Sequence, residues 1–480
     1  MGTPPLGFRN YITSYRSSMY TLDMATIHAS DSGRGTLRIG SGAGFADDRI
    51  EPAVELVESG DIQYLVFECL AERSVALAEL DRRRDPGRGY NPWLADRMEA
   101  VLPECAQRGI RIITNMGAAN PRAAGAVVTE VARARQLHGL TVAVVTGDDV
   151  LDRVLERPEL PLLEGSGSVG SLGDSIVSAH AYLGCDGITD ALGQGADVVI
   201  TGRIADPSLY IAPLVHEFGW DTDDWNLIAK GACVGHLLEC GAQVTGGYFA
   251  DPGYKDVPDL ANLGFPLAEV QRDGTFTISK VEGSGGMVTG DTCTEQLLYE
   301  VHDPSAYTSA DVVADFTTVR FAEIGRDTVL VRGARGRRRP DDLKVSVGYR
   351  DGFTGEGQIS YAGPNALARA ELALEILRER LQKRGMAADT TRYELIGVDS
   401  VTRGLNAGEP GAMNEVRVRV VGRTDTAGQA RGIAHEVSAM WLNGPAGGGG
   451  VVCSVTERIA IASVLLPRSE VSATVTISEV

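Results

Sequence analysis

The chain has 480 residues, a length that predicts roughly two to four domains. Hydrophobic residues make up 43% and charged residues 23%, which is typical of a globular protein and excludes a disordered one. Acidic residues outnumber basic ones by 64 to 45, and the net charge of −19 repels nucleic acid and anionic membranes. The 58 glycines follow no collagen period and predict tight turns and close approaches of the backbone to other groups.

The seven cysteines include no CxxC pair, and an odd number does not suit a disulfide framework. They therefore indicate free thiols in a reducing compartment. No apolar run reaches the roughly 18 residues of a membrane span, and no apolar segment follows Arg9 and Arg16 as it would in a signal peptide. We expect a cytoplasmic protein with neither a membrane nor a nucleic acid as partner.

Residues 1–35 form a polar lead-in segment, and from residue 36 short apolar runs alternate with amphipathic stretches. Short apolar runs of this kind are typical of strands buried on both faces, and the alternation predicts a parallel, Rossmann-like sheet with helical crossovers over residues 36–316. The predicted strands are Leu37–Ile39, Tyr64–Phe67, Ile110–Ile113, Val142–Val145 and Val198–Ile200. The predicted helices between and after them include Ile50–Glu58, Trp93–Arg108, Gly125–Leu137 and Trp225–Glu239.

Residues 317–480 form the second predicted domain. A hairpin of Lys344–Tyr349 and Gln358–Tyr361 comes first, followed by a helix at Asn365–Lys383. Two more strands, a helix at Ala427–Trp441 and a final strand complete the order ββαββαβ. This order predicts a C-terminal α+β sandwich with its helices on one face. The overall fold class is therefore α/β with an added α+β domain.

Polar residues follow every predicted strand of the first domain. In open parallel sheets, ligands bind beyond the carboxyl ends of the strands, so these residues are candidates for an active site. Glu68 stands where a buried strand meets this edge, a position that raises the pKa of a carboxyl group for acid/base chemistry. For Asp149 and Asn120 we favour the alternative role of helix capping.

We predict Glu68 as the main acid/base residue, with Asp206 or Asp48 as its counterpart. Asn115 and Arg203 are expected to polarise a carbonyl group or hold a carboxylate. The predicted substrate-binding residues lie at the same strand ends, at the end of the helix Trp225–Glu239, and in a Gly-rich aromatic loop at Thr245–Asp259, which is interpreted as a lid or subunit contact. They are Ser41, Gly42, Gly44, Gly117, Asp148, Glu239, Asp251 and Lys255.

Neither a cofactor nor a metal ion is predicted. The run Gly40-x-Gly42-x-Gly44 lacks the glycine that a dinucleotide fingerprint requires next, and Phe45 stands there instead. Cys233, His236 and Cys240 share a helix face, but core packing is the more usual role of such a face than metal binding.

Six segments resemble the acyclic terpene utilisation protein A family, and the resemblance extends over about residues 36–467. These segments are Ile39–Arg49, Tyr64–Arg73, Asn115–Pro121, Thr201–Ser208, His236–Gly247 and Cys293–Asp303. The resemblance implies a role near acyl-CoA intermediates of branched or terpenoid acid metabolism.

The leading hypothesis is a lyase that hydrates, dehydrates or cleaves a small carboxylic acid or its acyl-CoA thioester by acid/base chemistry. Two alternatives are a non-catalytic ligand-binding or scaffold subunit of an acyl-CoA pathway and a metal-dependent lyase that uses Asp47, Asp48 and Glu68. An anionic CoA substrate would need Arg203, Lys255 or the basic loop Arg335–Arg339 to offset the acidic sheet edge. Assembly into a homo-oligomer is also expected.

Overall fold

The computed structural model describes residues 35–386, 390–401 and 413–480, so residues 1–34 of the predicted lead-in lie outside the described residues. The chain forms two compact units. Unit 2 comprises residues 172–176 and 348–461, and the residues before, between and after these segments belong to unit 1. The predicted domain boundary at 317 falls inside unit 1, because β11 (Arg320–Gly325) and β12 (Thr328–Arg332) join its large sheet.

A ten-stranded mixed sheet forms the centre of unit 1. Its middle consists of five parallel strands in the order β1-β2-β3-β6-β4, and these are the five predicted strands. Antiparallel strands extend both sides: β7, β8, β12 and β11 beyond β1, and β18 beyond β4. The bounds are β1 Thr36–Ala43, β2 Tyr64–Phe67, β3 Arg111–Thr114, β4 Thr141–Thr146, β6 Val198–Thr201, β7 Pro266–Gln271, β8 Phe276–Lys280 and β18 Thr474–Glu479.

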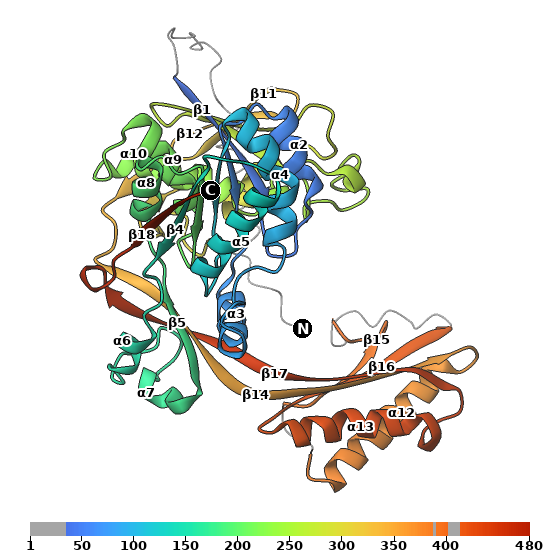
Figure 1. Cartoon of the computed structure of the whole chain (residues 1–480). Coiled ribbons are helices and arrows are strands. Elements are labelled where there is room, and N and C mark those ends of the chain that lie inside the picture. Colours follow the sequence, from blue (N-terminus) through green and yellow to red (C-terminus); the bar gives the residue numbers. More distant parts are fainter. Residues whose placement is uncertain (1–34, 387–389, 402–412) are drawn as a thin grey trace. The chain divides into compact units, whose positions relative to one another are not determined.

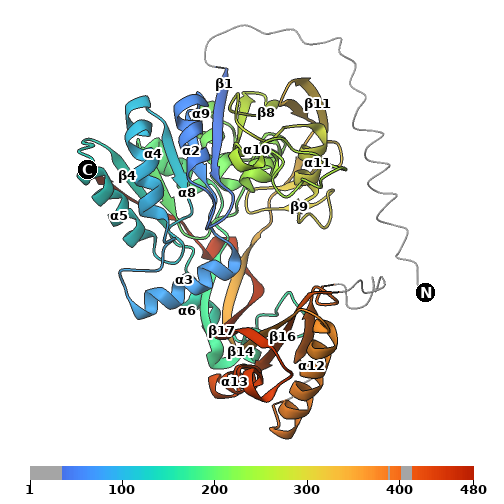
Figure 2. The ribbon, with the colours of Figure 1, turned by 90° about the vertical axis from the view of Figure 1, so that its right-hand side faces the viewer.

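Helices cover both faces of this sheet (Figures 1 and 2). Because successive strand residues point to opposite faces, Leu65 and Phe67 of β2 pack into one core and Tyr64 and Val66 into the other. The first core is closed by α2 (Glu51–Ser59), α4 (Leu94–Arg108) and α5 (Pro121–Ala134). The second is closed by α8 (Asp186–Gly193), α9 (Ser208–Phe218) and α10 (Trp225–Leu238). The protein is thus mixed α/β.

Two elements near the carboxyl ends of the parallel strands are absent from the predictions. Helix α3 (Glu72–Arg84) begins after Ala71, which has no side chain to cap it, and Ser74 supplies the capping hydroxyl instead. Strand β5 (Ile176–Ala181) is the other, and it includes His180. The remaining elements of unit 1 are α6 (Leu151–Leu155), α7 (Val169–Leu172), α11 (Gly290–Leu298), β9 (Tyr307–Thr308), β10 (Val313–Asp315) and β13 (Arg335–Arg337).

Unit 2 contains a sheet in the order β15-β16-β14-β17. Strands β15 (Arg392–Ile396) and β16 (Glu415–Thr424) lie within it, while β14 (Asp342–Ala362) and β17 (Gly448–Pro467) contribute residues to both units. Helices α12 (Ala366–Lys383) and α13 (Ala427–Asn443) pack against β16 and each other, and they are drawn in orange and red in Figure 1.

The predicted hairpin at Lys344–Tyr361 is wrong, because β14 is one continuous strand. Gly352 has a φ of +75° but does not reverse the chain. Among the described residues, no helix is both long and apolar enough to cross a membrane.

Candidate active site

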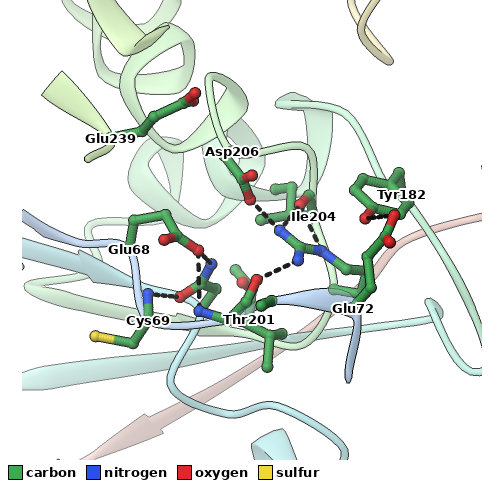
Figure 3. Close-up of polar contacts among 12 residues, drawn as sticks. Glu68, Cys69, Glu72, Tyr182, Thr201, Ile204, Asp206 and Glu239 are labelled. Atoms are coloured by element: carbon green, nitrogen blue, oxygen red, sulfur yellow. Dashed lines mark hydrogen bonds and ion pairs between the residues drawn. The ribbon is translucent and has the colours of Figure 1, made fainter. Parts of the chain in front are cut away.

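Strands β2, β3 and β6 are parallel neighbours, so the residues that follow them meet at one edge of the sheet. Glu68 follows β2, Asn115 follows β3, and Arg203 and Asp206 follow β6. Figure 3 shows Glu68, Asp206 and Glu239 around this edge. The structure therefore places four of the five predicted catalytic residues in one region.

Glu68 is held in a fixed orientation and is only 8% exposed. Its Oε1 accepts hydrogen bonds from Asn115 Nδ2 at 2.8 Å and from the backbone N–H of Leu70 at 2.9 Å. Asn115 is itself fixed, because its Oδ1 accepts from the backbone N–H of Cys69 at 2.7 Å. Burial and the charge of Asp206 raise the pKa of Glu68, although Arg203 and the two hydrogen bonds oppose this. Glu68 is thus positioned to keep a proton at neutral pH.

Arg203 is 1% exposed, and each nitrogen of its guanidinium group bonds to the protein. It donates to the backbone carbonyls of Leu70 and Ile204 and forms an ion pair with Asp206. Its guanidinium carbon lies 4.6 Å from the centre of the Tyr182 ring. Arg203 was predicted to contact substrate, but these bonds make it a residue that positions Asp206 and the surrounding loops.

Asp206 is the predicted acid/base residue that faces open space. Its side chain is 35% exposed, and it lines a cavity of about 350 Å³. Burial raises its pKa, Arg203 lowers it, and the nearby charge of Glu239 adds to the increase, with a net upward shift. Glu239 is oriented by a hydrogen bond of 2.8 Å between its Oε1 and His236 Nδ1.

Tyr182 and Lys344 line the same cavity and were not among the predicted site residues. Tyr182 Oη donates to Glu72 Oε1 at 2.8 Å, and Lys344 Nζ lies 2.6 Å from the same oxygen. Tyr182 directly follows β5, which had not been predicted, so the rule of polar residues at strand ends could not identify it. Tyr307 contributes a second aromatic side chain to the cavity.

Asp48, the other predicted counterpart of Glu68, is bonded to its own loop. Its Oδ2 accepts from the backbone N–H of Gly44 and its Oδ1 from that of Arg49, both at 2.9 Å. Burial raises its pKa. Asp148 is buried and accepts hydrogen bonds from the backbone N–H of Arg203 at 2.8 Å and from His180 at 2.9 Å. Both aspartates hold loops in place at this edge.

Asp251 and Lys255 do not line the cavity beside Asp206. The two residues form a tight turn, in which their backbones bond to each other, and Lys255 pairs with Glu295. The structure therefore does not bring this loop into the group of Glu68, Asn115, Arg203 and Asp206.

The predicted ligand-binding glycines are explained by packing inside the chain. A Cβ atom at Gly42 would lie 2.6 Å from the Phe67 ring, and one at Gly44 would lie 2.2 Å from the carbonyl carbon of Cys240. A Cβ atom at Gly117 would lie 2.4 Å from the carbonyl oxygen of Thr201.

Ser41, which was predicted to bind substrate, is fully buried within β1. It accepts a hydrogen bond of 3.1 Å from Tyr210 Oη. Its contacts in the structure are therefore to the core.

Nothing in the described part of the chain groups three or more His, Cys, Asp or Glu side chains as a metal site would require. Cys233 and His236 are both buried, and Cys233 packs in the second core, as the packing interpretation predicted. Asp47, part of the metal-lyase alternative, accepts a hydrogen bond of 3.0 Å from Trp93 Nε1. This alternative therefore receives no support from the arrangement of the carboxylates.

Comparison with curated proteins and with solved structures gives no significant match. The family model described as acyclic terpene utilisation family protein AtuA matches residues 37–477, almost the whole chain. The match includes the strands, the sheet edge and the cavity described above, and it agrees with the resemblance found in the sequence. The chain therefore belongs to the acyclic terpene utilisation family AtuA.

Proposed function

We propose that this chain is an enzyme of branched or terpenoid acid metabolism that acts by acid/base chemistry on a carboxylic acid or its CoA thioester. The observation that carries the proposal is the pair Glu68 and Asp206. Both carboxyl groups have a raised pKa, the charge of the buried Arg203 guanidinium acts on both of them, and Asp206 opens into a cavity. Perturbed carboxyl groups beside a cavity are typical of general acid/base catalysis.

In the proposed reaction, Asp206 removes a proton from the carbon next to the thioester carbonyl. The ammonium group of Lys344, which lines the same cavity, offsets the negative charge that develops on the carbonyl oxygen. In a dehydration, the C–O bond at the next carbon breaks, a C=C bond forms, and the hydroxyl group leaves as water after taking a proton. Glu68 holds that second proton, since its raised pKa keeps it protonated.

The direct test incubates the purified protein with enoyl-, 3-hydroxyacyl- and 3-hydroxyglutaryl-type CoA thioesters and follows the change in mass. Wild-type protein is expected to convert at least one of them by gain or loss of water or by cleavage of a C–C bond. Asp206→Asn keeps the shape of the side chain but removes the base, so kcat is expected to fall by about 100-fold or more.

A matched control is Asp149→Asn, which also changes an aspartate at a strand end. Asp149 is paired with Arg82 and accepts from the backbone N–H of Leu151, and it does not line the cavity. Its variant is expected to turn over like wild type. Measurable binding of these thioesters without any turnover by wild-type protein would contradict the proposal and favour a binding subunit.

A further inference from the structure

A second, basic cavity adjoins the one that contains Asp206. It has a volume of about 730 Å³ and is lined by three arginines, Arg338, Arg339 and Arg468, together with Trp225. Pro340 and Asp341 line both cavities, so the two share a wall. A ligand that reaches from one cavity to the other needs only to pass these two residues.

The positive charge in this cavity is only partly neutralised. Arg468 donates to the backbone carbonyls of Pro340 and Ala310, and among the described residues no carboxylate forms an ion pair with it. Arg339 has one loose partner, with Nη1 3.7 Å from Asp186 Oδ2. Arg339 and Arg468 line the same cavity, and burial together with the positive charge of Arg339 lowers the pKa of Arg468.

Acidic groups in the cavity do not cancel this charge. Asp341 pairs with Arg338 at 2.8 Å, and that pair is exposed to solvent. Asp223 is the other acidic residue of the lining. The lining thus contains three guanidinium groups and two carboxylates, with Asp186 beside Arg339 outside the lining, in a chain whose overall charge is −19. A bound dianion would relieve the repulsion between Arg339 and Arg468.

We propose that this basic cavity binds the phosphate-bearing adenosine end of an acyl-CoA, while the acyl group reacts beside Asp206. Guanidinium groups bind phosphate through paired, charge-assisted hydrogen bonds, and the indole of Trp225 offers an aromatic surface for the adenine base. The linking arm of CoA then crosses the shared wall at Pro340 and Asp341. This inference rests on the proposed function only for the reaction of the acyl group beside Asp206; binding of the adenosine end does not depend on it.

The test compares an acyl-CoA with the N-acetylcysteamine thioester of the same acyl group, which lacks the nucleotide and its phosphates. Arg339→Gln is the variant of choice, because Arg339 has only the loose contact to Asp186. The KM for the acyl-CoA is expected to rise about tenfold or more, with kcat unchanged and both constants for the N-acetylcysteamine thioester unchanged. Arg326→Gln removes an equally charged but 95% exposed side chain outside the cavity and is expected to have no effect.

Calorimetry with adenosine 3′,5′-bisphosphate decides the inference without turnover. Wild-type protein is expected to bind it, Arg339→Gln to bind it about tenfold more weakly, and inorganic phosphate at equal concentration not to displace it. An unchanged KM for acyl-CoA in Arg339→Gln, or equal displacement by inorganic phosphate, overturns the inference. If wild type converts neither thioester but binds the bisphosphate more tightly than Arg339→Gln does, the proposed function is wrong and the proposed binding site is supported.

Discussion

The proposed chemistry depends on buried carboxyl groups at one edge of the large sheet. Glu68 follows the fully buried strand β2, and it is surrounded by backbone and amide donors. The strand-end rule was sufficient to locate Glu68, Asn115, Arg203 and Asp206. It could not reveal that the guanidinium group of Arg203 donates to two backbone carbonyls. This depends on how the loop after β6 meets the loop after β2, which is far away in the sequence.

The raised pKa of Glu68 makes a prediction about stability. Between the ordinary pKa of glutamate, about 4.3, and its raised value, the folded protein holds a proton that the unfolded chain releases. The free energy of unfolding therefore decreases as the pH rises through this window. Glu68→Gln cannot ionise and keeps an oxygen for both hydrogen bonds. The difference in Tm, variant minus wild type, is therefore expected to increase from pH 5 to pH 9.

Thermal unfolding at several pH values measures this difference. Glu58→Gln is the control, since Glu58 is exposed on α2 and is expected to leave the pH profile unchanged. Parallel pH profiles for wild type and Glu68→Gln would show that Glu68 is not held protonated in the folded protein.

At the scale of elements, the parallel strands and the larger helices could be predicted because each carries a clear pattern. The β2 run is apolar throughout, and α4 has a regular apolar face. Helix α3 was missed because most of its residues are charged or polar and its first turn lacks a capping side chain at Ala71. Strand β14 was predicted as a hairpin of two strands, and the pair Asp351-Gly352, which favours turns, lies between them.

The cap of α5 supports a prediction at this scale. Asn120 was expected to cap this helix, and its Oδ1 accepts from the backbone N–H of Ala123. Its Nδ2 also donates to the carbonyls of Pro86 and Arg88, at 2.9 and 2.7 Å. Asn120→Ala is expected to lower the free energy of unfolding by about 1–2 kcal/mol.

Urea denaturation measures this loss, and Asn120→Ser serves as a partial rescue. Serine restores the oxygen of the cap but not the two donor bonds, so the stability of this variant is expected to lie between wild type and Asn120→Ala. Equal stability of all three proteins would show that the cap contributes nothing.

At the scale of the whole molecule, each unit has a core of its own. Unit 2 buries residues of α12, α13 and β16 together, separately from the two cores of unit 1. Length alone predicted more than one domain. The position of the boundary was not predictable, because only the pairing of β12 with β8, and of β11 with β12, shows that both strands belong to unit 1.

Separate cores predict separate unfolding transitions, and Glu436 can identify the one that belongs to unit 2. Its side chain on α13 is 6% exposed. Its carboxylate oxygens lie 3.0 Å from Arg380 Nε in α12 and 2.6 Å from Nη1 of Arg384, the residue that follows α12. Hydrogen bonding to Arg380 lowers its pKa, so the stabilisation exists above the ordinary pKa and is lost as the pH falls. Glu436→Gln is expected to destabilise unit 2 alone, by about 1–3 kcal/mol.

Scanning calorimetry tests this expectation by resolving the two transitions. Glu379→Gln is the control, because Glu379 pairs with Lys383 on the exposed face of α12 and is expected to change little. If Glu436→Gln lowered both transitions equally, the two units would unfold as one.

The pairing of β18 with β4 has a consequence for how the protein is made. Thr474 lies opposite Thr146, so the ribosome synthesises all of unit 2 between these two partners. Until β18 has been synthesised, β4 presents an unpaired strand edge, which other chains can bind. The second unit can complete its own core during this interval. The nascent chain therefore carries one finished unit and one sheet still open at its edge, and this is the stage at which a chaperone would have most to protect.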